Sequence, residues 1–245
     1  MAATGEARQL TEAHRLAQAQ LGATVVAAMR AVWPLLDLAD IDGTIERWLR
    51  ASSLIVSGQR AASARLAGTY VQTFKTLELG AAAPAVPLVL AEAPTEQAVI
   101  TSLVVTGPTA AKAALRRGAP LAIASQVAEA RSAASAMRHV LNGGRDTIVQ
   151  TVDTDRQARG WARVVSGSGC ALCAMLASRG PVYRGGSVTF DAHDGCLCGA
   201  EPVYRDDAEW PRGARRYRAL WDETTTGLPA DEDPLNAFRR ALTPT

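Results

Sequence analysis

The chain has 245 residues, a formal net charge of +2 and 48% hydrophobic residues. A chain of this length and apolar content can bury one large core or two smaller ones. The near-balanced charge does not indicate a dedicated nucleic-acid-binding protein. No uninterrupted run of about eighteen apolar residues predicts a membrane span, and the first residues do not resemble a secretory signal. Paired cysteines are therefore expected to bind metal rather than to form disulfides.

Two long helices are predicted in the N-terminal part. Apolar residues recur every three or four positions over 7–36 and again over 43–79. Trp33-Pro34 should end the first helix, because proline cannot continue the hydrogen-bond ladder, and Gly80 should end the second. Two long helices joined by a short connection predict an antiparallel hairpin.

The second helix has candidate caps and an apolar stripe. Asp42 or Thr44 is expected to cap its N-terminus. The helical spacing of its large apolar residues predicts burial in the hairpin or at a partner surface, and these residues include Trp48, Leu49, Ile55 and Leu66.

The middle of the chain is punctuated by proline and glycine. Residues 81–97 contain three prolines and predict a linker or an extended arm. The segment 99–105 fits a short strand or the start of a helix, and Thr106-Gly107-Pro108 resembles a helix start.

A further helix is expected to open at Pro120 and to stop at Gly143-Gly144. Asp146 or Thr147 would then cap another helix that runs to Arg159.

All four cysteines lie within 29 residues, together with one of the three histidines. Thiolate and imidazole are preferred zinc ligands, and a Cys-x2-Cys turn paired with a second short motif is typical of structural zinc sites. Residues 161–204 are rich in glycine, with two short strands expected at 181–184 and 188–190, and such a loop-rich unit gains stability from a metal. The candidate ligands are Cys170, Cys173, His193, Cys196 and Cys198.

Five candidates compete for a site that usually takes four. Cys170 and Cys173 are expected to act together, and the other half is His193 with Cys196, one of these two with Cys198, or Cys196 and Cys198 with His193 beside the ligands; the sequence does not decide. A structural zinc site is the first interpretation. Free or transiently oxidised thiols are the second, and a catalytic zinc with one open position is the third. Asp191, His193 and Asp194 also fit part of a nuclease-like centre.

The C-terminal part is basic. A helix is expected between Arg205 and Trp221, and a last short helix from Pro234 carries Arg239-Arg240. Two interpretations fit the arginines of this part: they contact phosphate groups, or they form a solvated surface together with the acidic residues between them. The candidate nucleic-acid contacts are Arg212, Arg215, Arg216 and Arg218.

No catalytic residue is assigned. His14 and His139 lie on helix patterns, and Ser166 and Ser168 lie near glycines. The chain contains no Gly-x-Ser-x-Gly or His-Glu-x-x-His motif.

The predicted fold is mainly α, with an N-terminal helical hairpin or bundle followed by a small loop-rich α+β zinc-binding unit. The expected regions are a helical region at 1–80, the arm at 81–97, a second helical region at 98–160, the zinc-binding unit at 161–204 and an Arg-rich helical tail at 205–245.

Three segments resemble the Mu F-type head morphogenesis family of tailed-bacteriophage minor head proteins, especially its actinobacterial phage branch. They are Trp161-Ala-Arg-Val-Val, the segment 170–183 that begins Cys-Ala-Leu-Cys, and Phe190-Asp-Ala-His-Asp-Gly-Cys-Leu-Cys198. The match covers about residues 143–204. Asp194 stands where the family often has proline, and Leu197 where it often has arginine.

The resemblance implies a minor capsid protein of the virion, located inside the procapsid near the portal. The implied partners are the portal protein, and also scaffold or major capsid protein, with phage DNA at packaging or ejection and no membrane. Members of this branch are often labelled capsid maturation protease, which is one alternative. A zinc-dependent nucleic-acid-binding protein or nuclease is the other.

Overall fold

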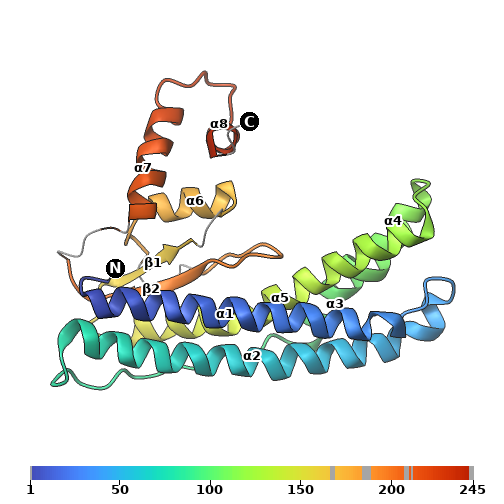
Figure 1. Ribbon diagram of the computed structural model, residues 1–245, viewed down its shortest axis with the longest axis horizontal. Coiled ribbons are helices and arrows are strands. Elements are labelled where there is room, and N and C mark those ends of the chain that lie inside the picture. Colours follow the sequence, from blue (N-terminus) through green and yellow to red (C-terminus); the bar gives the residue numbers. More distant parts are fainter. Residues whose placement is uncertain (1, 166–168, 184–188, 207–209, 211, 243–245) are drawn as a thin grey trace.

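The computed structural model describes residues 2–165, 169–183, 189–206, 210 and 212–242. Three long helices lie side by side and form a rod: α1 (Gly5–Val32), α2 (Ile41–Leu79) and α5 (Leu121–Thr154) (Figure 1). A smaller C-terminal part stands on one end of this rod. The mainly helical fold, with a small two-stranded sheet and a cysteine cluster near the C-terminus, confirms the predicted fold class.

The α1–α2 hairpin forms as predicted. The 3-10 turn η1 (Trp33–Leu35) ends α1 at its proline, and Gly80, with a φ of 88°, ends α2. The predicted cap of α2 was wrong. Asp40 is the N-cap, and its carboxylate accepts the N–H of Gly43 at 3.1 Å. The Thr44 hydroxyl instead turns back and donates to the carbonyl of Asp40 at 2.6 Å.

The hairpin core contains Trp48, which is fully buried and meets the edge of Trp33 at 5.7 Å between ring centres. Leu49 and Ile55 are half-buried against the same cluster. Leu66 is 39% exposed, so its predicted burial in the hairpin was wrong, and its burial at a partner surface stays a prediction.

The segment after α2 is an extended arm. It lies along α5, where the N–H groups of Val89 and Ala91 donate to the hydroxyls of Thr151 and Thr147, each at 3.0 Å. These backbone N–H groups of the arm therefore find their hydrogen-bond acceptors in side chains of α5 rather than in a neighbouring strand.

One helix follows the arm, built from α3 (Glu96–Val104), the π-helical turn η2 (Val105–Thr109) and α4 (Ala110–Arg116). The expected helix start at Gly107-Pro108 was wrong. The wider π turn accommodates a proline inside the helix, and a Cβ on Gly107 would lie 2.9 Å from the Trp48 ring. By length and mean hydropathy (1.4), Glu96–Arg116 could cross a membrane, and 39% of that window is buried in the fold. A helix in the core of a folded protein meets the same criterion of length and hydropathy.

The prediction that a helix ends at Gly143-Gly144 was also wrong, since α5 runs through both glycines without interruption. A Cβ on Gly143 would lie 2.6 Å from the carbonyl oxygen of Arg60, and one on Gly144 would lie 2.8 Å from the Ser63 hydroxyl. The two glycines therefore let α2 and α5 approach closely. No helix starts at Asp146 or Thr147.

The C-terminal part contains a two-stranded antiparallel sheet that the sequence did not predict, formed by β1 (Gly160–Val164) and β2 (Gly199–Val203). Of the two strands expected at 181–184 and 188–190, only a single bridge from Tyr183 to Trp161 is seen. Residues 184–188 lie outside the described residues.

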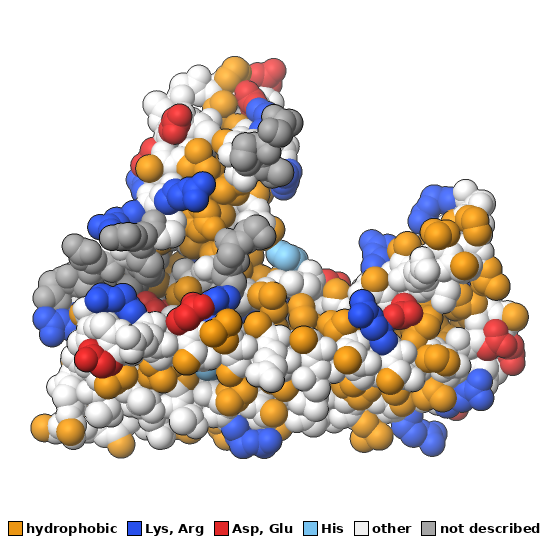
Figure 2. Space-filling model, viewed as in Figure 1, with side chains coloured by type: hydrophobic (Ala, Val, Ile, Leu, Met, Phe, Trp, Pro, Cys, Tyr) orange, Lys and Arg blue, Asp and Glu red, His pale blue; other side chains and the backbone are white. Residues whose placement is uncertain are grey.

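A lobe of three helices projects from the sheet (Figure 1): α6 (Ala171–Ser178), α7 (Arg212–Thr225) and α8 (Pro234–Leu242). Its core gathers Ala171, Ala174 and Phe238, with Tyr217 and Trp221 packed against them. The predicted last helix is confirmed, whereas α7 begins later than the expected Arg205. This lobe and the α4–α5 turn rise from the same side of the rod and leave a concave surface between them (Figure 2).

Candidate metal centre

The first two cysteines are held by the start of α6. Cys170 is the N-cap residue, and its Sγ accepts the N–H of Cys173 at 3.4 Å. A helix N-terminus carries partial positive charge, which favours a thiolate there. Cys173, one turn later, is buried, whereas Cys170 is exposed.

The second half of the centre is a tight turn that leads into β2. The N–H of Cys196 donates to the carbonyl of His193 at 3.1 Å. Gly195 has a φ of +78°, a left-handed conformation that glycine adopts without strain. Because β2 pairs with β1 and α6 follows β1, the sheet brings this turn next to the first cysteine pair.

All five predicted ligand residues come together. They form two overlapping groups of three, each with ligand atoms within 4.8 Å of one another: Cys170, Cys173 and His193, and Cys173, Cys196 and Cys198. Cys170 Sγ lies 2.9 Å from His193 Nε2, and Cys173 Sγ lies 3.5 Å from Cys196 Sγ. Cys173 is the residue that both groups share.

The ring of His193 is oriented for ligation. Its Nδ1 lies 2.8 Å from the carbonyl oxygen of Asp194, and because a carbonyl only accepts, Nδ1 carries the hydrogen. This hydrogen bond raises the pKa of His193, against the opposing effect of partial burial. Nε2 then presents its lone pair toward Cys170 and Cys173. Metal-binding histidines typically donate their other N–H to such a carbonyl.

Two buried arginines accompany the cysteines. Arg145 from α5 donates to the carbonyls of Cys198 (2.9 Å) and Cys196 (2.5 Å). Arg163 from β1 lies 3.8 Å from Cys173 Sγ and 3.8 Å from the centre of the Phe190 ring. Within the described chain, neither arginine forms an ion pair with a carboxylate.

Buried guanidinium groups require nearby negative charge. The thiolates of this cluster are the adjacent source. Burial lowers the pKa of Arg145, and the charges of Cys196 and Cys198 oppose that effect. Hydrogen bonds from Cys173 and Cys198, and then the charge of Arg145, lower the pKa of Cys196 to about 2. The arrangement therefore favours thiolate, the form of cysteine that binds metal, at Cys196, whereas hydrogen bonds with Cys196 and Cys198, and then burial, raise the pKa of Cys173.

The sequence did not single out Arg145, Arg163 or Phe190. The signal available was weak: Arg163 lies in the Trp161 segment that carries the family resemblance, and Arg145 directly follows the glycine pair.

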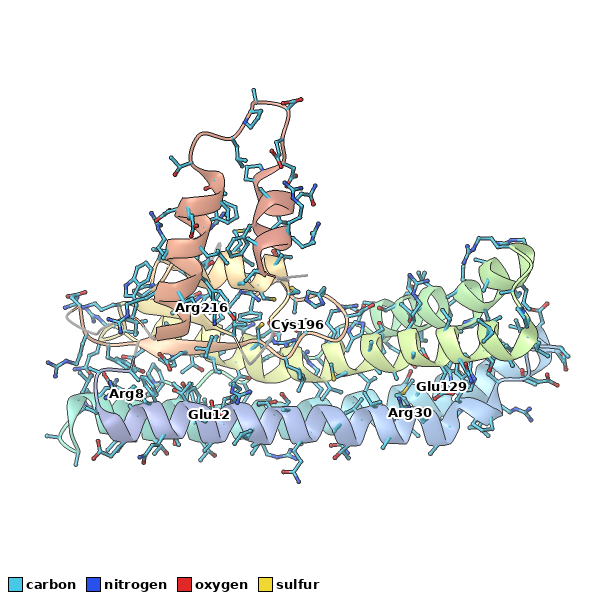
Figure 3. All side chains as sticks on the ribbon, turned by 45° about the horizontal axis from the view of Figure 1, so that its top comes forward. Arg8, Glu12, Arg30, Glu129, Cys196 and Arg216 are labelled. Carbon is cyan, nitrogen blue, oxygen red and sulfur yellow. The ribbon has the colours of Figure 1, made fainter. Side chains whose placement is uncertain are left out.

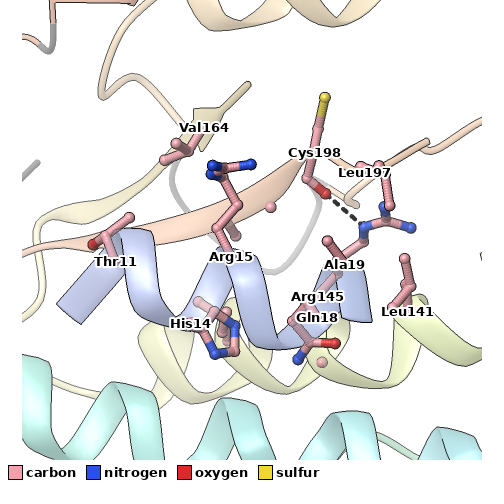
Figure 4. A pocket seen from close by; sticks show the side chains of 14 residues that line it. Thr11, His14, Arg15, Gln18, Ala19, Leu141, Arg145, Val164, Leu197 and Cys198 are labelled. Carbon is pink, nitrogen blue, oxygen red and sulfur yellow. Dashed lines mark hydrogen bonds between the residues drawn. The ribbon is translucent and has the colours of Figure 1, made fainter. Parts of the chain in front are cut away.

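The turn that carries the ligands is fastened to the rod. Arg138 Nε lies 2.6 Å from the Asp194 carboxylate, and the N–H of Gly195 donates to the carbonyl of Ala134. Figure 4 shows a small cavity where the rod meets the C-terminal part, lined by residues of α1, α5, the turn and both strands, including His14, Val164 and Cys198. Its volume of about 30 Å³ accommodates little more than a water molecule.

The histidines considered for catalysis serve packing in the rod. His14 is partly buried and stacks on Tyr70 with ring centres 4.3 Å apart, and burial lowers its pKa to about 4. His139 is buried on α5, and burial, followed by the charges of Arg138 and Arg60, lowers its pKa to about 4. Ser166 and Ser168 lie outside the described residues.

The candidate nucleic-acid contacts lie on α7, a different element from the turn that carries Cys196 (Figure 3). Arg215, Arg216 and Arg218 are exposed. Arg218 pairs with Asp222 one helical turn later at 2.8 Å. The backbone of Arg212 starts α7, and its side chain is outside the described part of the chain.

Comparison with known proteins gives a phage relationship. A family model described as VG15 protein matches residues 6–224. The Gene 15 protein of Mycobacterium phage D29 is 31% identical over 176 residues, which cover 52% of this chain and 64% of that relative. The chain thus spans less than two-thirds of the length of this curated relative. No solved structure matches significantly.

Proposed function

The chain belongs to the VG15 protein family, and from that premise we propose that it is a minor capsid protein of a tailed bacteriophage, associated with the portal during head morphogenesis. One observation carries the proposal. The motif residues on which the resemblance to Mu F-type head proteins rests converge on one centre, in a chain related to a phage gene product. Their convergence gives that motif a structural role.

The proposed cofactor is a structural zinc ion. The donor set of thiolates and an oriented imidazole fits zinc, and the buried arginines balance thiolate charge. When bound, zinc would supply a cross-link between the start of α6 and the turn at 193–198. Arg145 and Arg163 hold that turn and Phe190 in place, so the chain itself aligns the two halves.

The proposed location is the capsid interior near the portal, with host cytoplasm during assembly. The rod offers long helical faces for packing against portal, scaffold or major capsid protein. The exposed arginines of α7 favour an additional contact with packaged DNA. If they contact phosphates, the affinity for DNA should fall steeply with added salt, and Arg216→Ala with Arg218→Ala should reduce that salt dependence.

Purified particles test the main proposal. Immunogold labelling and cross-linking should place the chain at the portal vertex in few copies. Its absence from both procapsids and mature particles would refute the proposed role. Processing of capsid protein that depends on His139 or Ser168 would favour the maturation protease instead.

A further inference from the structure

The outer end of the helical hairpin made by η2, α4 and the start of α5 has its small residues inside. α4 and α5 pack against each other, and every buried residue of α4 is an alanine, as are the first two of α5: Ala110, Ala111, Ala114, Ala124 and Ala128. The large apolar residues point outward instead and are between 41% and 57% exposed, namely Val105, Leu121, Ile123 and Val127.

This pattern is the reverse of that in a helix pair surrounded by water. There, large apolar side chains face the neighbouring helix and polar side chains face the solvent. Helix pairs in lipid instead place small residues at the helix contact, because no hydrophobic effect drives their large apolar side chains away from the acyl chains. The outer end of the hairpin therefore presents apolar side chains as a lipid-facing pair does.

The charges of this segment are all positive. Residues 97–128 contain no aspartate or glutamate, and their three charged residues are exposed: Lys112, Arg116 and Arg117. Arg116 and Arg117 lie at the α4–α5 turn, which projects away from the rod (Figure 1). Figure 2 shows basic and hydrophobic side chains together on this projection.

Acidic side chains approach the base of the hairpin rather than its turn. Asp42 of α2 lies 3.7 Å from Lys112, and Glu129 pairs with Arg30 of α1 at 3.4 Å (Figure 3). Asp40, which precedes α2, is engaged as the N-cap of that helix. The turn itself therefore keeps its positive charge.

Exposed cations beside large exposed apolar side chains fit the surface of an anionic lipid bilayer. Lipid phosphates attract arginine and lysine, and the boundary of the acyl chains accepts leucine and isoleucine. A nucleic-acid backbone offers phosphates to the cations but no apolar partner to Leu121 and Ile123. Lipid accounts for both features of the turn, and nucleic acid accounts for one.

We propose that the α4–α5 turn is a membrane-contact site, which inserts Leu121 and Ile123 shallowly into an anionic lipid surface with Arg116 and Arg117 at the phosphates. The contact does not span the bilayer. Although Glu96–Arg116 has the length and hydropathy of a span, Val99 and Leu103 at its start are buried in the rod. The inference goes beyond the proposed head-protein function and does not depend on portal association.

Flotation of the full-length chain with lipid vesicles tests the site. Wild type should bind vesicles of phosphatidylglycerol and phosphatidylcholine at least about tenfold more tightly than vesicles of phosphatidylcholine alone, and added salt should weaken that binding. Leu121→Ser with Ile123→Ser should weaken binding to the anionic vesicles at least about tenfold, because the inserted apolar area is lost. Arg116→Gln with Arg117→Gln should weaken it by a similar factor and leave binding to neutral vesicles unchanged.

Leu16→Ser with Leu54→Ser is the matched control. It also replaces two leucines that are more than half exposed, but these lie on α1 and α2. Binding to the anionic vesicles should then change by less than about twofold. Circular dichroism and thermal melting of each variant establish that it is folded.

Each other outcome overturns the assignment. If wild type does not float with anionic vesicles, the membrane contact is refuted. If the hairpin variants float as wild type does, or if the control loses as much binding as they do, another surface contacts lipid. If the hairpin variants instead lose duplex DNA binding or self-association, in a chain that does not bind vesicles, the turn serves nucleic acid or a second copy. None of these results decides portal association, which particle labelling tests separately.

Discussion

The rod and the C-terminal part are held together by different physical means. In the rod, α1, α2 and α5 bury apolar side chains along most of their length, and small residues set the distance between the helices. In the C-terminal part the strands are five residues each, and the interior contains three cysteines and Arg163, with Arg145 of α5 buried against them. Apolar burial explains most of the first region, whose buried charges at Arg60 and Lys75 are paired with carboxylates. The second depends on how its buried charges and thiols are satisfied.

The junction between the two regions is itself polar. Lys75 of α2 pairs with Asp155 at the end of α5 at 2.8 Å, and Tyr204, just after β2, donates to the same carboxylate at 3.1 Å. All three side chains are buried. The rod therefore fixes the position of the sheet through hydrogen bonds that one substitution can break.

The largest expected effect is loss of the centre. Cys173→Ser removes the residue common to both ligand groups and should abolish zinc binding, which in small zinc domains contributes folding free energy on the order of 10 kcal/mol. Residues 160–204 should lose protection from hydrogen exchange, while α1 and α2 keep theirs. Exchange mass spectrometry together with elemental analysis measures both. A folded Cys173→Ser protein with one zinc per chain would contradict the assignment.

Two milder variants sharpen the ligand set. Cys170→Ser and Cys198→Ser each remove a cysteine that belongs to one group alone. A variant that retains zinc identifies a cysteine outside the tetrahedral set; the sequence leaves open whether Cys198 is such a residue.

The next effect concerns the junction. Asp155→Ala leaves the buried ammonium of Lys75 without its partner and should cost about 3–5 kcal/mol of unfolding free energy. Chemical denaturation measures this loss. The matched control is Asp222→Ala, which removes the exposed partner of Arg218 and should cost less than about 1 kcal/mol. Equal losses would mean that the buried pair does not stabilise the junction.

A smaller effect tests the packing of the rod. Gly143→Ala places a Cβ 2.6 Å from the Arg60 carbonyl and should destabilise by about 1–3 kcal/mol as α2 is pushed away. Gly58→Ala is the control, because that helical position has nothing within 4 Å and alanine should stabilise it by about 0.5–1 kcal/mol. Thermal melting of the two variants should give shifts of opposite sign.

These glycines show where sequence reasoning succeeds and where it fails. Gly80 ends a helix as predicted, because it adopts a left-handed φ of 88° and prolines follow it at positions 84 and 87. Gly143 and Gly144 have the same local signature, yet their role is set by Arg60 and Ser63, about 80 residues earlier in the chain. A local pattern cannot distinguish a helix stop from a site of close helix contact.

The same limit applies to the candidate site. The sequence predicted which residues gather, because cysteine clustering is a composition signal that survives without a structure. It did not predict β1 and β2, since five-residue strands that pair across about 40 residues leave little periodicity. It also missed Arg145 and Arg163, whose importance comes from burial beside thiolates rather than from any motif.

The smallest expected effect is a pH dependence within the rod. Burial lowers the pKa of His14 from 6.5 to about 4, so the folded chain holds this imidazole neutral where the unfolded chain protonates it. The resulting stability is complete above about pH 6.5 and is lost as the pH falls toward 4. Because the side chain is only partly buried, we expect the free energy of unfolding to fall by about 1–2 kcal/mol over this range. His14→Phe keeps an aromatic ring against Tyr70 and should flatten the unfolding free energy over the same range. Urea denaturation at pH 6.5 and pH 4.5, followed through α1 and α2, measures the difference. An unchanged slope in the variant would show that His14 does not cause the acid sensitivity, and would leave His139, whose pKa burial also lowers to about 4, and the cysteine centre as its sources.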